Sequence, residues 1–545
     1  MKHYLTKLEE TIKANWKRPA LCDYGGQVFT YGDIARNTEM FRLFFEKAGI
    51  EKGSKIALCA KNSARWALAF WAINTYEAVA VPLLADFLPN TIAHLVNHSE
   101  SILLFTEKEI WKKLDKTKMP LLEAAFDVND FSLIWSRDNE ILVAWDWRDF
   151  HYWDTHEIEM GPIDFHYPNE NEDRLAIINY TSGTTSTPKG VMLTYGAISD
   201  TDEFCNTHFP NHVGETVVSM LPLAHMYGLG IEFIHPNVDG VTVYFLGKAP
   251  TPTLLLKAMQ DVKPYMVVTV PLVMEKVYAN SIRPALDKLK KPLSIPLIKD
   301  LFYSMVKKKI LTAFGGRVRC FIMGGAPMKP EVERCFKRIR LPYTVGYGMT
   351  EACPLLCWEW WSKFVPGSCG KPVHEIRIDS DDPKNIAGEI QARGANLTIG
   401  YYKNPEANAT AFTKDGWFRT GDLGVMDADG NVFIRGRIKS MILNSSGQNV
   451  YPEEIEAVLS DCPYVAESIV VEREGKIVAL VYPIGFEEID EDKKLFLEKT
   501  ILLAEQIRDM VNKSLPPYSR IAKVELQNQP FEKTPKMSIK RYLYR

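Results

Sequence analysis

Short apolar runs alternate with longer helical patterns along most of the chain. Residues 63–75, between the first two such runs, have the length and composition of a buried helix. Strands that alternate with helices in this way predict an α/β architecture with largely buried sheets. The strand-like runs are 55–60, 78–82, 216–220, 241–246, 266–270 and 320–323.

The pattern changes after about residue 436. Residues 452–460 and 496–513 predict two helices, and the apolar runs 466–471 and 476–482 predict two strands. A segment of roughly a hundred residues is large enough for a separate domain. We therefore predict the following organisation: a large domain at 1–436, a hinge at 437–440 and a small α+β domain at 441–545.

Charge and hydropathy exclude several other classes of protein. Lys and Arg number 65 and Asp and Glu 68, so the electrostatic argument for a nucleic-acid partner is missing. The basic segment 288–309 is the local exception, and it predicts a helical insertion with a solvated face. The most apolar stretch, 66–88, contains Asn74, Glu77, Pro82 and Asp86, which predicts a buried helix, a turn and a strand instead of a membrane span.

The N-terminal segment and the cysteines predict a cytoplasmic protein. Residues 1–10 mix charged and apolar positions without the apolar core of a signal peptide. The nine cysteines include no C-x-x-C pair, which suits buried thiols in a reducing compartment. Peripheral membrane contact through an amphipathic surface stays open. A zinc site is a possible interpretation of four residues that lie close in sequence: Cys353, Cys357, Cys369 and His374.

The loop 180–190 is the strongest chemical signal in the sequence. It lies between the predicted strands 175–179 and 191–194 and contains six Ser or Thr hydroxyls, two glycines and Lys189. Glycines allow turns that direct backbone N–H groups inward, hydroxyls add donors and the lysine adds charge, so the loop can surround a triphosphate. A strand follows the lysine, so this is not a Walker A loop, which opens a helix.

With its closing Pro188-Lys189-Gly190, this loop resembles the signature loop of the adenylate-forming superfamily, which comprises acyl-CoA synthetases, peptide-synthetase adenylation domains and beetle luciferases. The family has Gly where this chain has Ser186. The resemblance implies stacked sheets in a large N-terminal domain and a small mobile C-terminal domain. It also implies ATP, Mg²⁺ and coenzyme A as cosubstrates. The loop positions that would hold the nucleotide are Thr181, Ser182, Gly183, Thr184, Thr185 and Lys189.

Later motifs follow in the family's order and extend the resemblance over essentially the whole chain. The motif 346–351 would bind the base, the α-phosphate and the metal, and it accounts for the nearby cysteines without zinc. The resemblance implies Gly325 and Ala326 at the adenine edge, Tyr347 and Gly348 beside adenine, Thr350 at the α-phosphate, Glu351 on the metal with help from Thr184, Asp422 and Arg437 on ribose, and Lys439 at the hinge.

The C-terminal tail departs from the family pattern. The family's catalytic lysine position falls on Ser538, and a neutral hydroxyl cannot supply the positive charge that the attacking carboxylate needs. Two interpretations follow: adenylation is impaired while thioester formation is intact, or Lys536 or Lys540 replaces the missing lysine through its long flexible stem. A catalytically weakened nucleotide or acyl-AMP binding protein is the alternative from another class.

The segment 219–231 occupies the place where the family lines its acyl pocket, so His225, Tyr227 and Gly228 are predicted to border the acid. The segment 270–278 and the basic insertion after it look most like long-chain fatty acid–CoA ligases. The function predicted is activation of a fatty acid to its adenylate and then to its CoA thioester. An enzyme for another carboxylic acid, or one that loads an acyl carrier protein, stays open.

Overall fold

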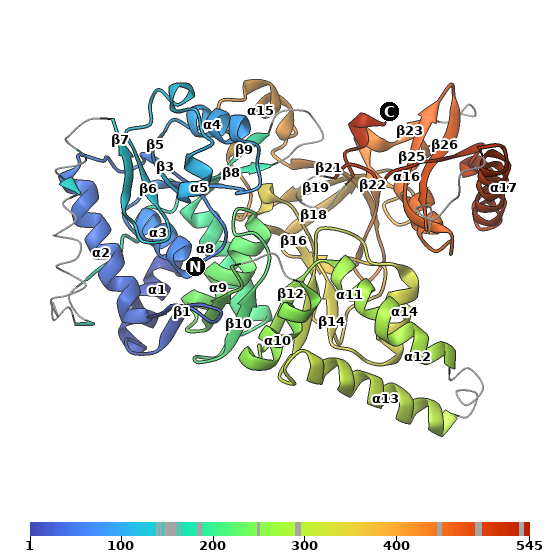
Figure 1. Cartoon of the computed structure of the whole chain (residues 1–545), viewed down its shortest axis with the longest axis horizontal. Helices are drawn as coiled ribbons and strands as arrows, with labels where there is room; N and C mark the ends of the chain where they lie inside the picture. The colour runs from blue at the N-terminus through green and yellow to red at the C-terminus, as the bar shows by residue number, and fades with distance from the viewer. Residues whose placement is uncertain are drawn as a thin grey trace.

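The computed structural model describes residues 1–137, 141, 144–145, 161–162, 165–181, 188–247, 251–288, 296–443, 449–484, 493–533 and 539–544. Two large sheets form the N-terminal part of the chain, and a smaller domain holds its C-terminal end (Figure 1). The mixed α/β architecture with a separate small C-terminal domain is therefore confirmed. Within these ranges no helix is long and apolar enough to cross a membrane.

The first large sheet carries the predicted phosphate-binding loop between two neighbouring strands. Its inner strands are parallel, while the strands at both of its edges run antiparallel to their neighbours. In spatial order the described strands are β20 (Gly400–Tyr401), β9 (Lys189–Thr194), β8 (Leu175–Thr181), β4 (Val79–Leu83), β3 (Lys55–Cys59), β5 (Ser101–Thr106), β6 (Ala124–Asp127) and β7 (Leu133–Ser136).

The second large sheet is parallel except for one edge strand. Because parallel strands end at the same side, the loops after β10, β12, β13 and β14 meet at one edge, where α/β sheets bind ligands. In spatial order the strands are β14 (Tyr343–Val345), β13 (Cys320–Met323), β12 (Met266–Thr269), β10 (Thr216–Ser219), β11 (Thr242–Phe245), β1 (Pro19–Asp23) and β2 (Val28–Thr30).

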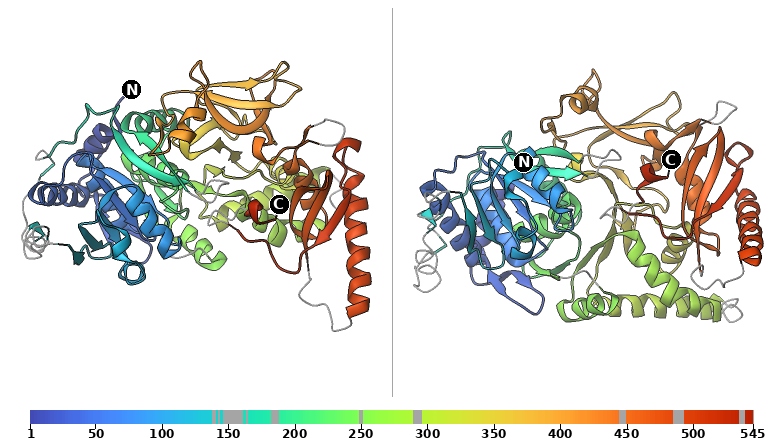
Figure 2. Two further views of the ribbon diagram at one scale, coloured as in Figure 1. Left: turned by 90° about the horizontal axis from the view of Figure 1, so that it is seen from above. Right: turned by 45° about the horizontal axis from the view of Figure 1, so that its top comes forward.

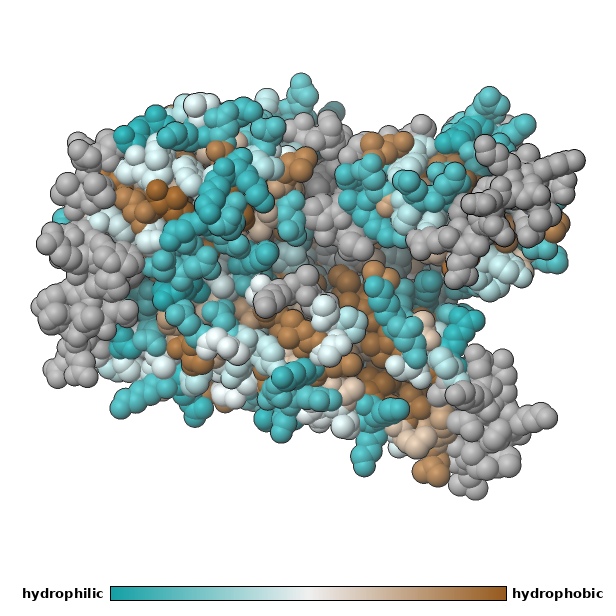
Figure 3. Space-filling model, viewed as in Figure 1, coloured by the Kyte–Doolittle hydropathy of each residue, from teal (hydrophilic) through white to brown (hydrophobic). Residues whose placement is uncertain are grey.

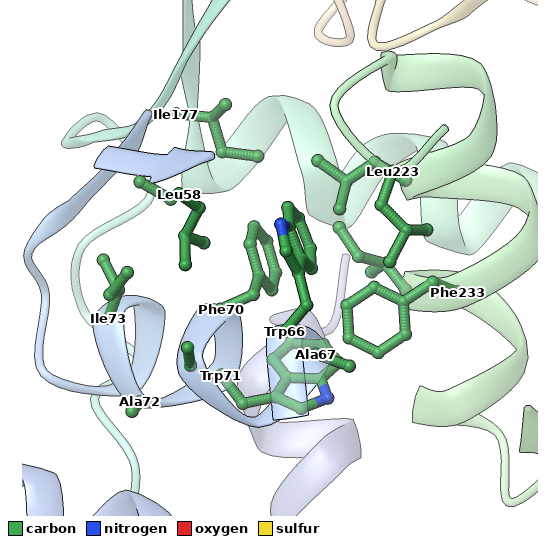
Figure 4. Close-up of a cluster of buried hydrophobic side chains, with 14 of the residues drawn as sticks. Leu58, Trp66, Ala67, Phe70, Trp71, Ala72, Ile73, Ile177, Leu223 and Phe233 are labelled. Carbon is green, nitrogen blue, oxygen red and sulfur yellow. The ribbon is translucent and has the colours of Figure 1, made fainter. Parts of the chain in front are cut away.

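Helix α3 (Ala64–Thr75) is buried between these two sheets, which explains why its sequence is apolar on every side. Figure 4 shows Trp66 and Phe70 between Leu58 and Ile177 of the first sheet on one side and Phe233 on the other. Trp71 contacts the Phe233 ring at a centroid distance of 5.1 Å. The stretch 66–88 is therefore the predicted buried helix and strand.

Further helices cover the sheets and the edge of the molecule. The described residues of the basic insertion 288–309 are helical, as predicted: α12 (Arg283–Lys288) ends at its first residue and α13 (Pro296–Ala313) contains 296–309. Besides α3, α12 and α13, the described α-helices before the C-terminal domain are α1 (Tyr4–Ala14), α2 (Tyr31–Lys47), α4 (Pro89–His98), α5 (Lys108–Trp111), α8 (Tyr195–His208), α9 (His235–Val238), α10 (Pro252–Val262), α11 (Pro271–Val277), α14 (Pro330–Arg338) and α15 (Pro405–Ala411).

Smaller antiparallel sheets connect the large sheets to the C-terminal domain (Figure 2). An Asp-Gly hairpin closes one of them, since Met426 pairs with Val432 across residues 427–431, which include Asp429 and Gly430. One of these sheets contains β15 (Tyr347–Gly348), β16 (Leu355–Trp358) and β17 (Lys371–Pro372), and the other contains β18 (Glu375–Asp379), β19 (Gly388–Arg393), β21 (Phe418–Met426) and β22 (Val432–Arg437).

The C-terminal domain has its own apolar core, formed by residues from Ile442 to Val524. A single 3-10 turn, Ile438–Ser440, lies between β22 and this core, at the predicted hinge. The predicted helix 452–460 has the predicted bounds, whereas α17 starts three residues before the predicted 496. The described elements are β23 (Ile442–Leu443), β24 (Asn449–Val450), α16 (Pro452–Ser460), β25 (Val465–Arg473), β26 (Lys476–Pro483), α17 (Lys493–Asn512) and β27 (Lys523–Leu526).

One face of the molecule exposes apolar side chains below the C-terminal domain (Figure 3). On α13, Leu301 is 74% and Met305 is 59% exposed, one helical turn apart. Lys308 and Lys309 are exposed further along the same helix. Along α13, two exposed apolar side chains are therefore followed by two exposed lysines.

Candidate active site

The predicted phosphate-binding loop joins two paired strands at the edge of the first sheet. β8 ends at Thr181 and β9 begins at Lys189, and the antiparallel register places these two residues opposite each other. Ser182, Gly183, Thr184 and Thr185 lie outside the described residues, so their roles stay predictions. The pairing brings both ends of the loop to one place, with Lys189 at its base.

Lys189 lies over an aromatic ring that the sequence did not single out. Its Nζ is 4.8 Å from the centroid of the Tyr401 ring, a favourable position for a cation. The Tyr401 hydroxyl donates to Oε1 of Glu351 at 3.0 Å. Burial, and then the nearby Glu351 charge, raise the pKa of Tyr401, so its hydroxyl keeps the proton it donates. Tyr401 thus connects the base of the loop to the predicted metal ligand.

Glu351 is held in place by its own backbone as well as by Tyr401. It lies in the 3-10 turn Thr350–Ala352, and its carbonyl accepts from the N–H of Thr398 at 2.8 Å. A carboxylate has about four acceptor sites, so the bond from Tyr401 leaves oxygen lone pairs for a hard cation. The donor set at Glu351 therefore fits Mg²⁺.

Two positions of the site favour glycine, one through its backbone conformation and the other through lack of space. Gly325 follows β13 with φ of +83°, a conformation that favours glycine. A Cβ on Gly348 would lie 1.9 Å from the carbonyl oxygen of Pro354, so this position requires glycine. Gly325, Ala326 and Gly348 are all exposed at the ends of their strands, which is where a ligand of the second sheet would lie.

Tyr347, Asp422 and Arg437 form one hydrogen-bonded group. The Tyr347 hydroxyl donates to Oδ2 of Asp422 at 2.7 Å, and Nε of Arg437 is 2.9 Å from Oδ1. Asp422 and Arg437 are directly opposite in the β21–β22 register. The Asp422 side chain is 6% exposed, so its charge is balanced by Arg437 and its orientation is fixed. Both predicted ribose-binding residues are therefore together.

The predicted acyl segment lies at the ends of the same parallel strands. The Tyr227 hydroxyl is 3.2 Å from the carbonyl oxygens of Thr269 and Ile322, on β12 and β13. Its ring is close to Gly324, where a Cβ would come within 3.2 Å of Cζ. His225 is half-buried and lies just before the helical turn that carries Tyr227. A Cβ on Gly228 would lie 2.8 Å from the Pro222 carbonyl oxygen, so glycine lets this segment fold back on itself.

Two buried polar residues around the acyl segment were not predicted from the sequence. Asn179 on β8 donates its amide to the carbonyl of Ala224 at 3.0 Å, which connects the phosphate-loop strand to the acyl segment. Glu232 lies in the π-helical segment Gly228–Ile234 and is fully buried. An isolated carboxylate inside the apolar run 229–234 was a signal for Glu232; nothing in the sequence indicated Asn179 or Tyr401.

In the C-terminal tail, Lys533 and Ile539 form an isolated antiparallel bridge, here called the hairpin base. Lys536 and Ser538, which lie between them in the sequence, are outside the described residues. Nζ of Lys540 is 3.1 Å from Glu532 at the hairpin base. Lys439 is exposed in the turn at the predicted hinge. The proposed roles of these lysines stay predictions.

The cysteine group does not assemble as a zinc site. Among the described residues, the group of His, Cys, Asp or Glu with metal-binding spacing is Asp202, His235 and Asp239, without any of the cysteines. Lys7 already places its ammonium 2.7 Å from Asp202. This buried cluster thus contains its own cation, and His374 pairs with Asp200 instead of meeting the cysteines.

Comparisons with known proteins show the family to which the chain belongs. The profile of the AMP-binding enzyme family matches residues 8–402, and that of the AMP-binding enzyme C-terminal domain matches residues 454–536. The 4-coumarate–CoA ligase 1 of Oryza sativa subsp. japonica is 28% identical, over 94% of this chain and 89% of its own. The long-chain-fatty-acid–CoA ligase FadD15 of Mycobacterium tuberculosis is also 28% identical, over 81% of this chain and 75% of its own.

The fold has close counterparts among solved structures. The o-succinylbenzoate coenzyme A synthetase of Bacillus subtilis, solved with ATP and a magnesium ion, has a TM-score of 0.75 and 21% identity, with 99% of both chains covered. The cosubstrates expected from the sequence, ATP, Mg²⁺ and coenzyme A, are those of this family's ligases. The chain belongs to the AMP-binding enzyme family and is an AMP-forming acid–thiol ligase.

Proposed function

We propose that this enzyme activates a fatty acid with ATP and transfers the acyl group to coenzyme A. The observation that carries the proposal is the near absence of charged residue types in the acyl segment. Along 219–234 the only Asp, Glu, Lys or Arg is Glu232, and it is fully buried. An amino acid or a dicarboxylate would need a charged partner there. An apolar acid needs none.

The first half-reaction forms an acyl-adenylate. A carboxylate oxygen of the acid attacks the α-phosphorus of ATP, and pyrophosphate leaves with the bonding electrons. Lys189 would hold the leaving pyrophosphate, while Asp422 and Arg437 would orient the ribose. Glu351 would hold Mg²⁺, which supplies charge neutralisation for the phosphate oxygens. Positioning and electrostatic stabilisation carry such reactions, so the residues need no covalent role.

In the second half-reaction the thiol sulfur of coenzyme A attacks the acyl carbon, AMP leaves and the thiol proton is released. The exposed turn at Lys439 is where we propose that the C-terminal domain rotates between the two steps. The contact between Nζ of Lys329 and the carbonyl of Ser460, at 3.2 Å, joins the two domains and would have to open. We further propose that the enzyme is cytoplasmic.

Two observations favour a fatty acid over an aryl acid: the resemblance of 270–278 and the basic insertion to long-chain fatty acid–CoA ligases, and one relative with higher identity. The long-chain-fatty-acid–CoA ligase 4 of Saccharomyces cerevisiae is 32% identical, over 60% of this chain. The test is a panel of acids of increasing length, set against 4-coumarate, with coenzyme A and ATP. Formation of the fatty acyl thioester supports the proposal, and a preference for 4-coumarate contradicts it.

We also propose that α13 brings the enzyme to anionic lipid, the source of an apolar acid. Leu301 and Met305 would enter the headgroup region and Lys308 and Lys309 would contact lipid phosphates. Vesicles with and without phosphatidylserine test this by flotation. The double variant Leu301→Ser/Met305→Ser should lose binding, and binding that is equal in both vesicles or unaffected by the variant contradicts it.

A further inference from the structure

We propose that Glu232 is the positioning residue of the acid-binding segment, which it fixes to the end of β10. The inference rests on the proposed function, because it takes 219–231 as the wall beside the acid. Among the described residues, the hydrogen bonds of Glu232 go to Ser219, Met220 and Leu221, and none goes to the predicted metal ligand Glu351. Its role would be indirect, through the backbone that it holds.

Three donors converge on one oxygen of Glu232. Its Oε2 accepts from the Ser219 hydroxyl at 3.1 Å, from the Met220 N–H at 3.1 Å and from the Leu221 N–H at 2.9 Å. These residues begin the acyl segment, where β10 ends and the chain leaves the sheet. The carboxyl group therefore satisfies two backbone donors that no strand pairs with at this point.

The helix that carries Glu232 is anchored in the core. Phe233, the next residue, packs against Phe70 and Trp71 of α3 at centroid distances of 5.6 and 5.1 Å; Figure 4 shows Phe233 directed toward this cluster. The π-helical segment is thus fixed by the apolar core between the two large sheets. π-Helical turns are frequent at functional sites. Glu232 transmits that fixed position to Ser219–Leu221.

A second side chain holds the same loop from the other side. Nδ2 of Asn62 donates to the Leu221 carbonyl at 2.7 Å, and the Leu223 N–H donates to Oδ1 of Asn62 at 3.0 Å. Leu221 is therefore held through its N–H by Glu232 and through its carbonyl by Asn62. The loop that leads to His225 and Tyr227 has a fixed backbone before any ligand binds.

The buried position also determines the charge of Glu232. Burial raises its pKa from the ordinary 4.5 to about 8, although its three donors oppose the rise. The other oxygen, Oε1, has no hydrogen-bond partner among the described residues. An unfolded chain ionises Glu232 above about pH 4.5, whereas the folded chain keeps the proton until about pH 8. Folding takes up a proton in this window, so Glu232 lowers stability as pH rises through it.

The substitution Glu232→Gln keeps an acceptor oxygen and a neutral group, whereas Glu232→Leu leaves three donors without an acceptor. We expect the Gln variant to bind a non-hydrolysable palmitoyl-sulfamoyl adenosine like the wild type. The Leu variant should bind it about tenfold more weakly, while its affinity for ATP changes less than twofold. Equal weakening for both ligands would indicate a general folding defect and would overturn the inference, as would no weakening for either.

A stability measurement needs no substrate and separates this inference from the proposed function. The melting temperature of the wild type should fall relative to that of Glu232→Gln between pH 5 and pH 8, and a constant difference overturns the neutral role. If the Leu variant does not fold, Ser219→Ala removes one donor and should weaken the palmitoyl analogue about threefold; unchanged binding overturns the inference. If the wild type binds only a coumaroyl analogue, the fatty acid is wrong and the same comparisons run with that analogue.

Discussion

The hydroxyl of Tyr347 donates a hydrogen bond of 2.7 Å to Oδ2 of Asp422, a residue 75 positions later in the chain. Asp422 in turn faces Arg437 across the β21–β22 ladder. Tyr347, which follows the last strand of the second sheet, and Arg437, at the end of the strand before the hinge, thus meet at the Asp422 carboxylate. This carboxylate is the one proposed to accept the ribose hydroxyls.

Tyr347→Phe removes the hydroxyl and keeps the ring. Because a hydrogen bond to a buried carboxylate is lost, we expect the KM for ATP to rise about tenfold with a smaller change in kcat. Pyrophosphate release at varied ATP measures this. Tyr343→Phe is the matched control, since that buried hydroxyl donates to the Glu333 carbonyl, at 3.4 Å, and to no carboxylate among the described residues. Equal effects from both variants would contradict the role of the Tyr347–Asp422 bond.

Tyr401 separates two functions in one side chain. Tyr401→Phe keeps the ring beneath Lys189 and loses only the bond to Glu351, so the Mg²⁺ concentration for half-maximal rate should rise roughly tenfold. Tyr401→Leu should also weaken pyrophosphate binding, because Lys189 loses its aromatic contact. Tyr402→Phe, whose hydroxyl contacts Glu100, should leave the Mg²⁺ dependence unchanged. A normal Mg²⁺ dependence in Tyr401→Phe would exclude this arrangement.

Gly348 is a position where one methyl group decides whether the site forms. In Gly348→Ala the new Cβ would overlap the Pro354 carbonyl oxygen, so the strand must move and ATP binding should fall at least tenfold. Gly346→Ala is the matched control two residues away, where the nearest atom is at an ordinary 3.4 Å. Calorimetric titration with ATP compares them. Tight ATP binding by Gly348→Ala would show that the close approach is dispensable.

Ser538 is the test of the C-terminal departure from the family. If the missing lysine limits adenylation, Ser538→Lys should increase the rate of pyrophosphate release at least tenfold without changing the rate of thioester formation from a supplied acyl-adenylate. If Lys536 or Lys540 substitutes for it, Lys536→Ala or Lys540→Ala should lower that rate. Lys540 is paired with Glu532 at the hairpin base, so Glu532→Gln is the control for the effect of that ion pair. An unchanged rate in all three lysine variants would contradict both interpretations.

The sequence predicted much of the fold because its signals were local. The strand Cys320–Met323, the helix Pro452–Ser460 and the Asp-Gly hairpin each depend on nearby residues, and all three are present. Helix α17 began earlier than predicted, since Lys493 and Lys494 continue a helix whose apolar pattern starts later. Boundaries of this kind are set by packing, which the local pattern does not contain.

The site residues that escaped prediction act through long-range contacts. Tyr401 reaches Glu351 across 50 positions and Asn179 reaches Ala224 across 45, and each is an ordinary polar residue in its own segment. Glu232 could have been suspected, because a carboxylate within an apolar run must be buried or exposed at a cost. Its partners at the end of β10 were not predictable without the sheet.

The central claim is that this ligase makes a fatty acyl thioester. The most direct measurement is mass spectrometry of the products from palmitate, ATP, Mg²⁺ and coenzyme A, with 4-coumarate in parallel, for the wild type and for Ser538→Lys. We predict palmitoyl-CoA together with equimolar AMP and pyrophosphate, with the larger yield from Ser538→Lys if the tail limits adenylation. A CoA thioester formed from 4-coumarate but not from palmitate, or no thioester from either protein, would contradict the account.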